Sequence, residues 1–194
     1  MFPESLETDA LVLEQFREER VDVFELYDRF AEGSEGTEDV FEYVPQEPYT
    51  SVKAARDPLI EAERSWDEAE AAQYAVYTAD DTLAGYTGLF PEWDRRMARI
   101  GFLLGKQYWG NGYAGECATA LIDLALDRLD LEVVAIDHAA GNERSKRAIE
   151  KVIDVRGGQY DGVLRNWLPI GDEVADHHRY TITREQYQRT GRDE

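Results

Sequence analysis

The chain has 194 residues, a length that suits one domain (residues 1–194) with its own buried core, and its single cysteine, Cys117, cannot form an intrachain disulfide. Its 41 acidic and 21 basic residues give a formal net charge of −20, which excludes nucleic-acid binding through a basic face and indicates adaptation to a salt-rich cytoplasm. No apolar run approaches the ~18 residues of a membrane span, and the N-terminus lacks the basic and apolar segments of a secretory signal, so we expect a cytoplasmic protein without a membrane partner.

The first third of the chain predicts one strand followed by three helices. The strand lies within Thr8 to Phe16, and Val21 to Phe30 carries its apolar residues on one helical face. A short helix is expected from Thr37 to Tyr43 and a longer one from Thr50 to about Glu70, each with its threonine as the N-cap.

Three extended segments and a glycine-rich turn form the middle of the chain. The segments are Gln73 to Thr78, Leu83 to Phe90 and Met97 to Leu104, and the short turn between the first two predicts an antiparallel hairpin. A turn containing Gly110 and Gly112 then separates the third segment from an apolar run with helical spacing that continues to Leu129.

A strand, a helix and two further strands complete the chain. Leu131 to Ile136 predicts a strand that lies parallel to residues 97–104 through a right-handed crossover. Asn142 is a candidate N-cap for a helix from Glu143 to about Ile153. The last strands are expected near Gln159 to Arg165 and His178 to Thr183. The fold class is therefore α/β, with a mixed and largely antiparallel sheet, a central parallel βαβ unit and flanking helices.

The glycine turn predicts a binding site for a phosphate or pyrophosphate. Small residues let the backbone approach a ligand closely, and the first N–H groups of a helix bind anions. The run Gly110-Asn-Gly112-Tyr-Ala-Gly115 also fits the G-x-G-x-x-G pattern of dinucleotide-binding proteins, with Asp137 about 20 residues further on. An NAD-dependent oxidoreductase is therefore an alternative. The later part of the chain disfavours it, because that part lacks the further parallel βα units of a dinucleotide-binding fold.

Five segments share their order and spacing with those of a known family. They are Thr8 to Phe16, Leu83-Ala-Gly85-Tyr-Thr-Gly-Leu89, Ile100-Gly-Phe with Tyr108-Trp-Gly-Asn-Gly-Tyr-Ala-Gly-Glu116, Asn142-Glu-Arg-Ser145 with Glu150-Lys151, and Tyr160-Asp-Gly162-Val-Leu-Arg165. Together they resemble the GNAT acetyltransferases, in the branch of the RimJ and RimL ribosomal-protein N-terminal acetyltransferases. The resemblance covers nearly the whole chain. It implies the GNAT fold and an N-acetyltransferase that uses acetyl-CoA as donor and needs no metal.

The resemblance also implies which residues bind acetyl-CoA. The pyrophosphate would be held by backbone amides of the glycine turn, which are those of Trp109, Gly110, Asn111, Gly112, Tyr113 and Ala114. The pantetheine chain would lie along the backbone of Phe102 and Leu104, and Asn142 would contact coenzyme A besides capping its helix. This placement agrees with the chemistry of the turn, because N–H groups at a helix start can hold phosphates without basic side chains.

The catalytic residues are harder to infer. Ser145 matches the serine that protonates the leaving thiolate in this branch, whereas Ile149 stands where many GNAT enzymes have a tyrosine for this role. The branch's glutamate base is replaced by Arg99, whose guanidinium cannot accept a proton. His138, next to Asp137, has a suitable unperturbed pKa and becomes the candidate base.

Other polar residues have alternative interpretations. Glu92 and Asp94 remain candidate bases, as does a relayed water molecule. Glu116 suits the positive end of the central helix and is expected to be structural. His177 and His178 are not expected to bind a metal, because neighbours on a strand point to opposite faces.

The acceptor amine is not encoded in a recognisable motif. The favoured acceptor is a protein N-terminal α-amine, ribosomal or other, and the alternative is a small-molecule amine. Its specificity would lie in the loops near Glu32 to Pro48 and Asn166 to Ala175, with Trp93 and Trp167 as candidate lining residues. A coenzyme A-binding sensor without transferase activity is a further alternative, and a homodimer is compatible with the fold.

Overall fold

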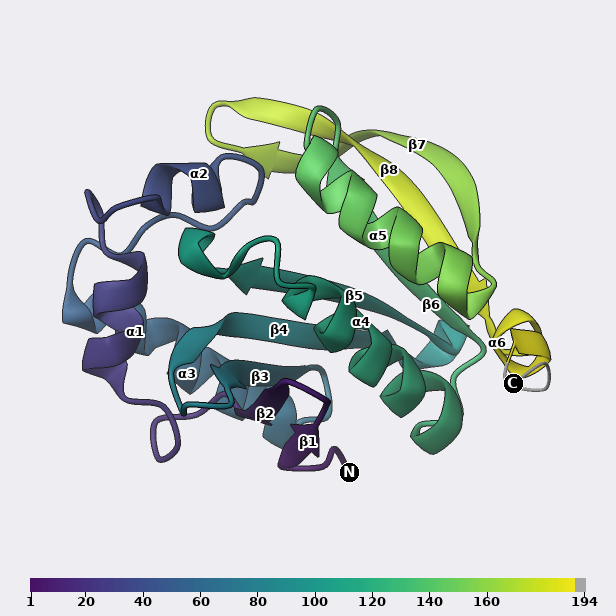
Figure 1. Ribbon diagram of the computed structural model, residues 1–194, viewed down its shortest axis with the longest axis horizontal. Coiled ribbons are helices and arrows are strands. Elements are labelled where there is room, and N and C mark those ends of the chain that lie inside the picture. Colours follow the sequence, from purple (N-terminus) through teal and green to yellow (C-terminus); the bar gives the residue numbers. More distant parts are fainter. Residues whose placement is uncertain (191–194) are drawn as a thin grey trace.

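A computed structural model of the chain describes residues 1–190, which form an eight-stranded sheet in the order β1-β2-β3-β4-β5-β6-β8-β7 (Figure 1). The strands are β1 (Ser5–Glu7), β2 (Leu11–Gln15), β3 (Ala72–Thr78), β4 (Leu83–Glu92), β5 (Met97–Leu104), β6 (Val133–Ala139), β7 (Gln159–Ile170) and β8 (Glu173–Thr183). Among these strands, β5 and β6 are the parallel pair, and the other neighbours are antiparallel. The predicted fold class is confirmed.

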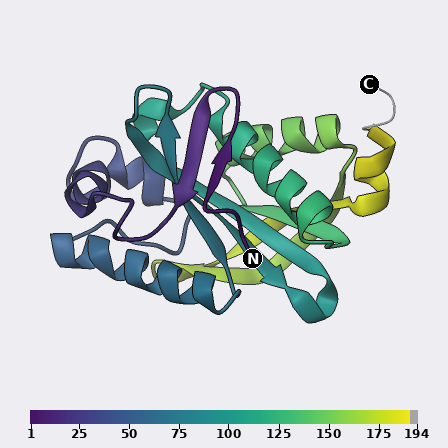
Figure 2. The same ribbon diagram turned by 90° about the horizontal axis from the view of Figure 1, so that it is seen from below.

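Helices cover both faces of the sheet (Figures 1 and 2). They are α1 (Val23–Phe30), α2 (Thr37–Phe41), α3 (Val52–Asp67), α4 (Tyr113–Asp123), α5 (Glu143–Arg156) and α6 (Arg184–Thr190). One buried cluster joins α4 and α5 to the sheet, and a second joins α1, α2 and α3 to it. The two sides are called the α4/α5 face and the α1/α3 face below. Within residues 1–190, no helix is both long and apolar enough to cross a bilayer.

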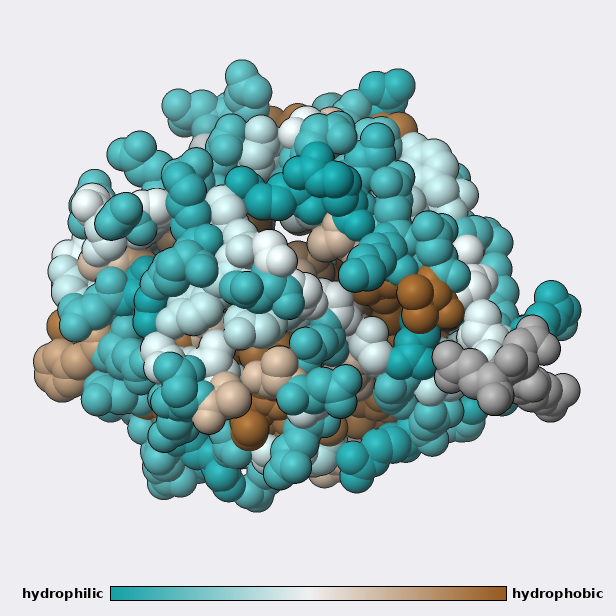
Figure 3. All heavy atoms as spheres, viewed as in Figure 1, coloured by the Kyte–Doolittle hydropathy of each residue, from teal (hydrophilic) through white to brown (hydrophobic). Residues whose placement is uncertain are grey.

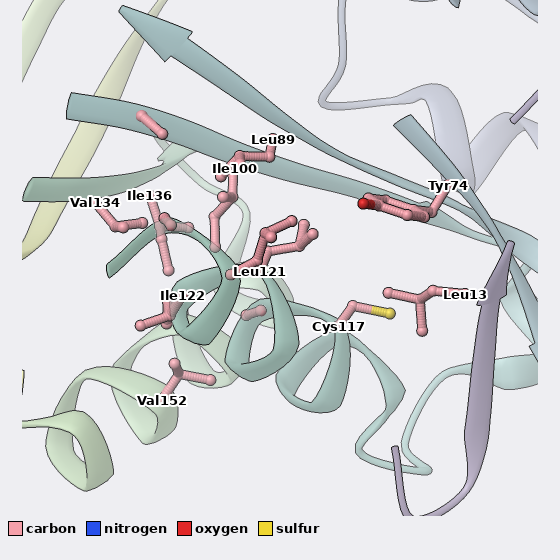
Figure 4. Packing of buried hydrophobic residues seen from close by; sticks show 14 of the residues in the cluster. Leu13, Tyr74, Leu89, Ile100, Cys117, Leu121, Ile122, Val134, Ile136 and Val152 are labelled. Atoms are coloured by element: carbon pink, nitrogen blue, oxygen red, sulfur yellow. The ribbon is translucent and has the colours of Figure 1, made fainter. Parts of the chain in front are cut away.

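The core beneath α4 explains why this helix forms where the sequence predicts it. Cys117, Leu121 and Ile122 project from α4 onto the strands, where they meet side chains such as Leu13 and Ile100 (Figure 4). All five are buried. Burial of a leucine or isoleucine stabilises a fold by about 1.5–3 kcal/mol, so the spacing of these apolar residues fixes the face that α4 presents.

Two helix starts differ from the expected positions. The N-cap of α3 is Ser51 and not Thr50: its extended backbone and its side chain, which accepts a hydrogen bond from the amide of Ala54, close the first turn. The N-cap of α2 is Gly36, with φ of 79°, so that Thr37 is the first helical residue. Neighbouring cap-forming residues have similar preferences, and the tertiary path of the chain decides between them.

Later elements extend beyond the expected boundaries. Strand β6 begins at Val133 and runs to Ala139, three residues past Ile136. Strands β7 and β8 form a long hairpin, and β1 and α6 were not predicted. The central helix passes into a π-helical turn at Leu124–Arg128. His138 is consequently inside a strand and not at its end.

Strands β5 and β6 separate halfway along their length. They pair only from Met97–Ile100 with residues 133–136. Beyond that point β5 stays on β4 through Leu104, while β6 stays on β8 through Ala139. The sheet therefore opens between residues 101–104 and residues 137–139, and this opening is called the split below.

Candidate functional site

A cavity of about 940 Å³ lies on the α4/α5 face at the split. Its lining comes from five segments, which are residues 7–9 at the β1–β2 turn, residues 39–44 at α2, residues 102–104 of β5, residues 108–123 of the glycine turn and α4, and residues 142–155 at α5. Figure 3 shows the surface hollowed in this region, with hydrophilic side chains around the opening. Every residue expected to bind coenzyme A belongs to this lining.

The glycine turn presents unpaired backbone amides to the cavity. Gly110 and Gly112 have φ of 84° and 85°, a conformation that glycine adopts readily. Helix α4 begins directly after Gly112, which has no side chain to cap it. In the described part of the chain, five consecutive amides have no protein acceptor, those of Gly110, Asn111, Gly112, Tyr113 and Ala114. Such a row at a helix start is an anion-binding arrangement.

Trp109 fixes this turn to the end of β5. Its amide donates to the carbonyl of Lys106 at 3.1 Å and is therefore engaged, unlike the five that follow. Its indole Nε1 donates to the carbonyl of Leu104 at 2.9 Å, and the guanidinium of Arg144 lies 3.4 Å from its ring centroid. The turn is thereby held between β5 and the start of α5.

The backbone of Phe102 and Leu104 faces the split. The carbonyl of Gly101 accepts from Thr87 of β4 at 2.8 Å, and the amide of Gly105 donates to β4 at 2.8 Å. Because successive backbone groups of a strand point to opposite edges, those of residues 102 and 104 point away from β4. The split leaves them without a neighbouring strand, as a linear ligand with amide groups would require.

The start of α5 brings Asn142 and Ser145 into the cavity wall. Asn142 is the N-cap, as predicted, and its side chain accepts from the amide of Ser145 at 3.0 Å. Within residues 1–190 the backbone amide of Ser145, and not its hydroxyl, is the group that bonds to Asn142, and the hydroxyl has no hydrogen-bond partner. Ile149, one turn further, is buried in the core.

The structure separates His138 from Asp137. His138 lies on the α4/α5 face, where its ring stacks on His178 at 5.1 Å and its Nδ1 donates to the carbonyl of Ala139 at 3.0 Å. Burial lowers the pKa of His138. Asp137 points to the opposite face, so the two do not form the pair that their adjacency suggested. Neither lines the 940 Å³ cavity.

Asp137 instead contacts two residues of β8 on the α1/α3 face. His177 Nδ1 lies 2.5 Å from its Oδ1, and Arg179 Nη2 lies 3.7 Å from its Oδ2. The guanidinium of Arg179 is 4.7 Å from the ring centroid of Trp167. These four residues are called the Asp137 cluster below. Sequence reasoning missed it because only the register of β6 against β8, Asp137 opposite Arg179, brings the residues together.

The remaining polar candidates have structural contacts. The Oε2 of Glu116 accepts from the Thr8 hydroxyl at 2.7 Å and from the Ala10 amide at 3.1 Å, so Glu116 ties the β1–β2 turn to α4. The carboxylate of Glu92 lies 2.7 Å from Nη1 of Arg95 and 3.4 Å from Nε of Arg99. Among residues 1–190, no group of three or more His, Cys, Asp or Glu side chains is placed to hold a metal ion.

The acetyltransferase (GNAT) domain family matches residues 10–152 of the chain. Among curated proteins, two similar ones are the uncharacterized N-acetyltransferases p20 of Bacillus licheniformis and YoaA of Bacillus subtilis. Each is 25% identical over 186 residues, which are 95% of this chain and 98% of the relative.

Two solved structures show the likeness of the fold. The ribosomal-protein-S5-alanine acetyltransferase from Vibrio fischeri has a TM-score of 0.77 at 14% identity, over 94% of this chain and 98% of that one. The spermidine N-acetyltransferase from Vibrio cholerae, in complex with CoA and spermine, has a TM-score of 0.72 at 17% identity, over 93% of this chain and 99% of that one.

Proposed function

We propose, from the premise that the chain belongs to the acetyltransferase (GNAT) family, that it transfers the acetyl group of acetyl-CoA directly to an amine. The observation that carries this proposal is the row of five unpaired amides at the start of α4, which faces a cavity of about 940 Å³. Two phosphates can share such a row without any basic side chain.

The donor site follows from the same geometry. Amides of residues 110–114 would bind the pyrophosphate, and the split-facing backbone of Phe102 and Leu104 would pair with the pantetheine amides. The carbonyl of Leu104 already accepts from Trp109, so its amide is the group left for the ligand. Asn142 borders the same cavity. The thioester would then lie at the split, where backbone edges position it for attack.

Ser145 is the proposed proton donor to the leaving thiolate. It lies in the cavity wall, and its amide is held by Asn142 while its hydroxyl is free to act. The resemblance to the RimL branch supports this role. Ile149 offers no proton, so no second donor is available at the tyrosine position of other GNAT enzymes.

The proposed acceptor is a protein N-terminal α-amine. The likeness to the ribosomal-protein-S5-alanine acetyltransferase supports it, and the likeness to the spermidine N-acetyltransferase favours a small-molecule amine as the second candidate. Thiol release from acetyl-CoA distinguishes the two when short peptides with free N-termini are compared with polyamines. A third candidate is a non-catalytic acetyl-CoA sensor, which Arg99 and Ile149 motivate and which predicts binding without turnover.

The first experiment measures acetyl-CoA binding by calorimetry at molar potassium chloride, with NAD as the control ligand. Gly112→Gln and Gly112→Glu form a matched pair: a Cβ there meets no atom within 4 Å, both side chains strain the same positive φ, and they differ by one charge. We expect the Glu variant to bind acetyl-CoA at least about tenfold more weakly than the Gln variant, or about 1.4 kcal/mol. Equal affinities would argue against the pyrophosphate site, and binding of NAD instead would support the dinucleotide alternative.

A further inference from the structure

The Asp137 cluster lies where the sheet opens towards the α1/α3 face. Asp137 directly follows Ile136, the last residue of β6 that pairs with β5. If the pairing continued, Gly101 would lie beside it. A Cβ atom on Gly101 would meet no heavy atom within 4 Å, and Gly101 is only half-buried although β5 is in the middle of the sheet. There is therefore open space beside Asp137 at the split.

Asp137 holds the His177 ring in one orientation. Because a carboxylate oxygen can only accept, the 2.5 Å contact requires the proton to be on Nδ1 of His177. In the neutral imidazole, Nε2 then carries the free lone pair. The carboxylate of Asp137 on β6 contacts His177, the guanidinium of Arg179 on β8 contacts the same carboxylate, and Arg99 of β5 lies on the same face of the sheet.

Several polar atoms of the cluster are buried and have no partner. The His177 side chain is 5% exposed, and its Nε2 makes no hydrogen bond with any described residue. The same is true of Trp167 Nε1 and of Nε and Nη2 of Arg179. An unpaired buried polar group costs about 1–3 kcal/mol. A ligand that brings a donor to Nε2 and an acceptor to the other atoms would recover this cost.

A β-bulge shapes this side of the site. The pairing of β7 with β8 shifts its register between Leu164 and Leu168, and Asn166 within the shift has φ of 48°. Its amide donates to the Oδ1 of Asp176 at 2.8 Å, which holds the bulge. Bulges next to active sites re-aim side chains, and this one lays the indole of Trp167 against Arg179.

We propose that His177 is the general base of the acetyl transfer and that Asp137 is its positioning residue, an inference that rests on the proposed acetyltransferase function. Strand β5 has no base at position 99, and β8 supplies one on the same face. The acceptor amine reaches Nε2 from the α1/α3 face, while the thioester lies in the split.

The proposed step balances its protons. The amine nitrogen forms the C–N bond, the C–S bond breaks, and one N–H proton passes to Nε2 of His177. The thiolate takes a proton from the hydroxyl of Ser145. His177 then gives its proton to water and Ser145 regains one from water, so that the net products are an amide and free coenzyme A. The carboxylate of Asp137 stabilises the imidazolium that forms in between.

The test compares His177→Gln and Asp137→Asn with His178→Gln in the full chain at molar potassium chloride. His178 is the matched control because its ring faces the other side of the sheet and bonds to the hydroxyl of Tyr160 at 2.9 Å. The measurements are kcat/KM for the amine between about pH 6 and 9, the acetyl-CoA Kd, and the melting temperature. We expect His177→Gln to lower kcat/KM about 100-fold or more and to leave only the acidic limb that the ionisation of the amine itself produces, with little change in Kd. Asp137→Asn should lower kcat/KM and change its acidic limb in the same direction. His178→Gln should keep the pH profile of the wild-type protein.

The outcomes separate this inference from the proposed function. If His177→Gln still turns over and its acidic limb is unchanged, His177 is not the general base, and the proposed acetyltransferase function is unaffected. Equal losses in the His177 and His178 variants would refute it as well. If His177→Gln unfolds, the near-isosteric Asp137→Asn decides the question through the same limb. If the wild-type protein binds acetyl-CoA but acetylates no amine, the proposed function is wrong, and so is the role of His177 as its general base.

Discussion

Ser145 offers a clean test of chemistry against structure, because Asn142 binds its amide and not its hydroxyl. Ser145→Ala therefore keeps the N-cap of α5 intact. We expect kcat to fall roughly 10- to 100-fold while the acetyl-CoA Kd and the melting temperature stay unchanged, since the thiolate loses a proton donor. Steady-state thiol release and calorimetry measure the two quantities. An unchanged kcat would assign Ser145 to local structure alone.

Cys117 should be chemically inert in the folded protein. Burial raises the pKa of its thiol to about 12, so almost no thiolate exists near neutral pH. We expect no reaction with Ellman's reagent in the native state and one equivalent after denaturation. A rapid native reaction would show that α4 opens or that the thiol is accessible. The inertness also means that thiol-release assays will report coenzyme A without interference.

At the scale of elements, Gly85 determines how closely β4 approaches β5. Its φ is 155°, and a Cβ there would lie 2.1 Å from the carbonyl oxygen of Leu103. We expect Gly85→Ala to lower the free energy of unfolding by roughly 1–3 kcal/mol more than the cost of its positive φ alone, because the strand backbone must move. Denaturant unfolding measures this change.

Gly171→Ala is the control for Gly85. Gly171 has φ of 57°, but a Cβ there meets nothing within 4 Å. Gly171→Ala is then expected to lower the free energy of unfolding only by the cost of a left-handed backbone conformation, which is about 1–2 kcal/mol. Equal effects at the two positions would show that conformation, and not the contact with β5, limits residue 85.

Local patterns predicted most elements but not how they associate. Strand β5 was predicted at its observed bounds because apolar residues and the glycine turn mark both ends. The predicted strands of the β7–β8 hairpin are shorter than the observed ones, because these exposed strands lack a clear apolar alternation. Backbone features of the site, such as the glycine turn, are similarly visible in sequence. The Asp137–His177 contact is not visible in the sequence, because it depends on which strand pairs with β6 and in which register.

At the scale of the whole molecule, the net charge of −20 should make stability depend on salt. The Debye length falls from about 8 Å at ~0.15 M to about 3 Å at ~1 M, which weakens repulsion among the surface carboxylates. We expect the melting temperature to rise with potassium chloride over this range. The ion pairs on the surface weaken as well, but each contributes only about 0–1 kcal/mol. A melting temperature that falls or stays constant would contradict adaptation to high salt.

The separation of β5 from β6 opens the sheet at a single point, between residues 101–104 and residues 137–139. In the proposed mechanism, acetyl-CoA binds in the cavity on the α4/α5 face, whereas the acceptor amine approaches the Asp137 cluster from the α1/α3 face. With two entrances on opposite sides, neither substrate has to wait for the other to bind or leave. We therefore expect random-order kinetics, in which each product competes only with the substrate that shares its entrance.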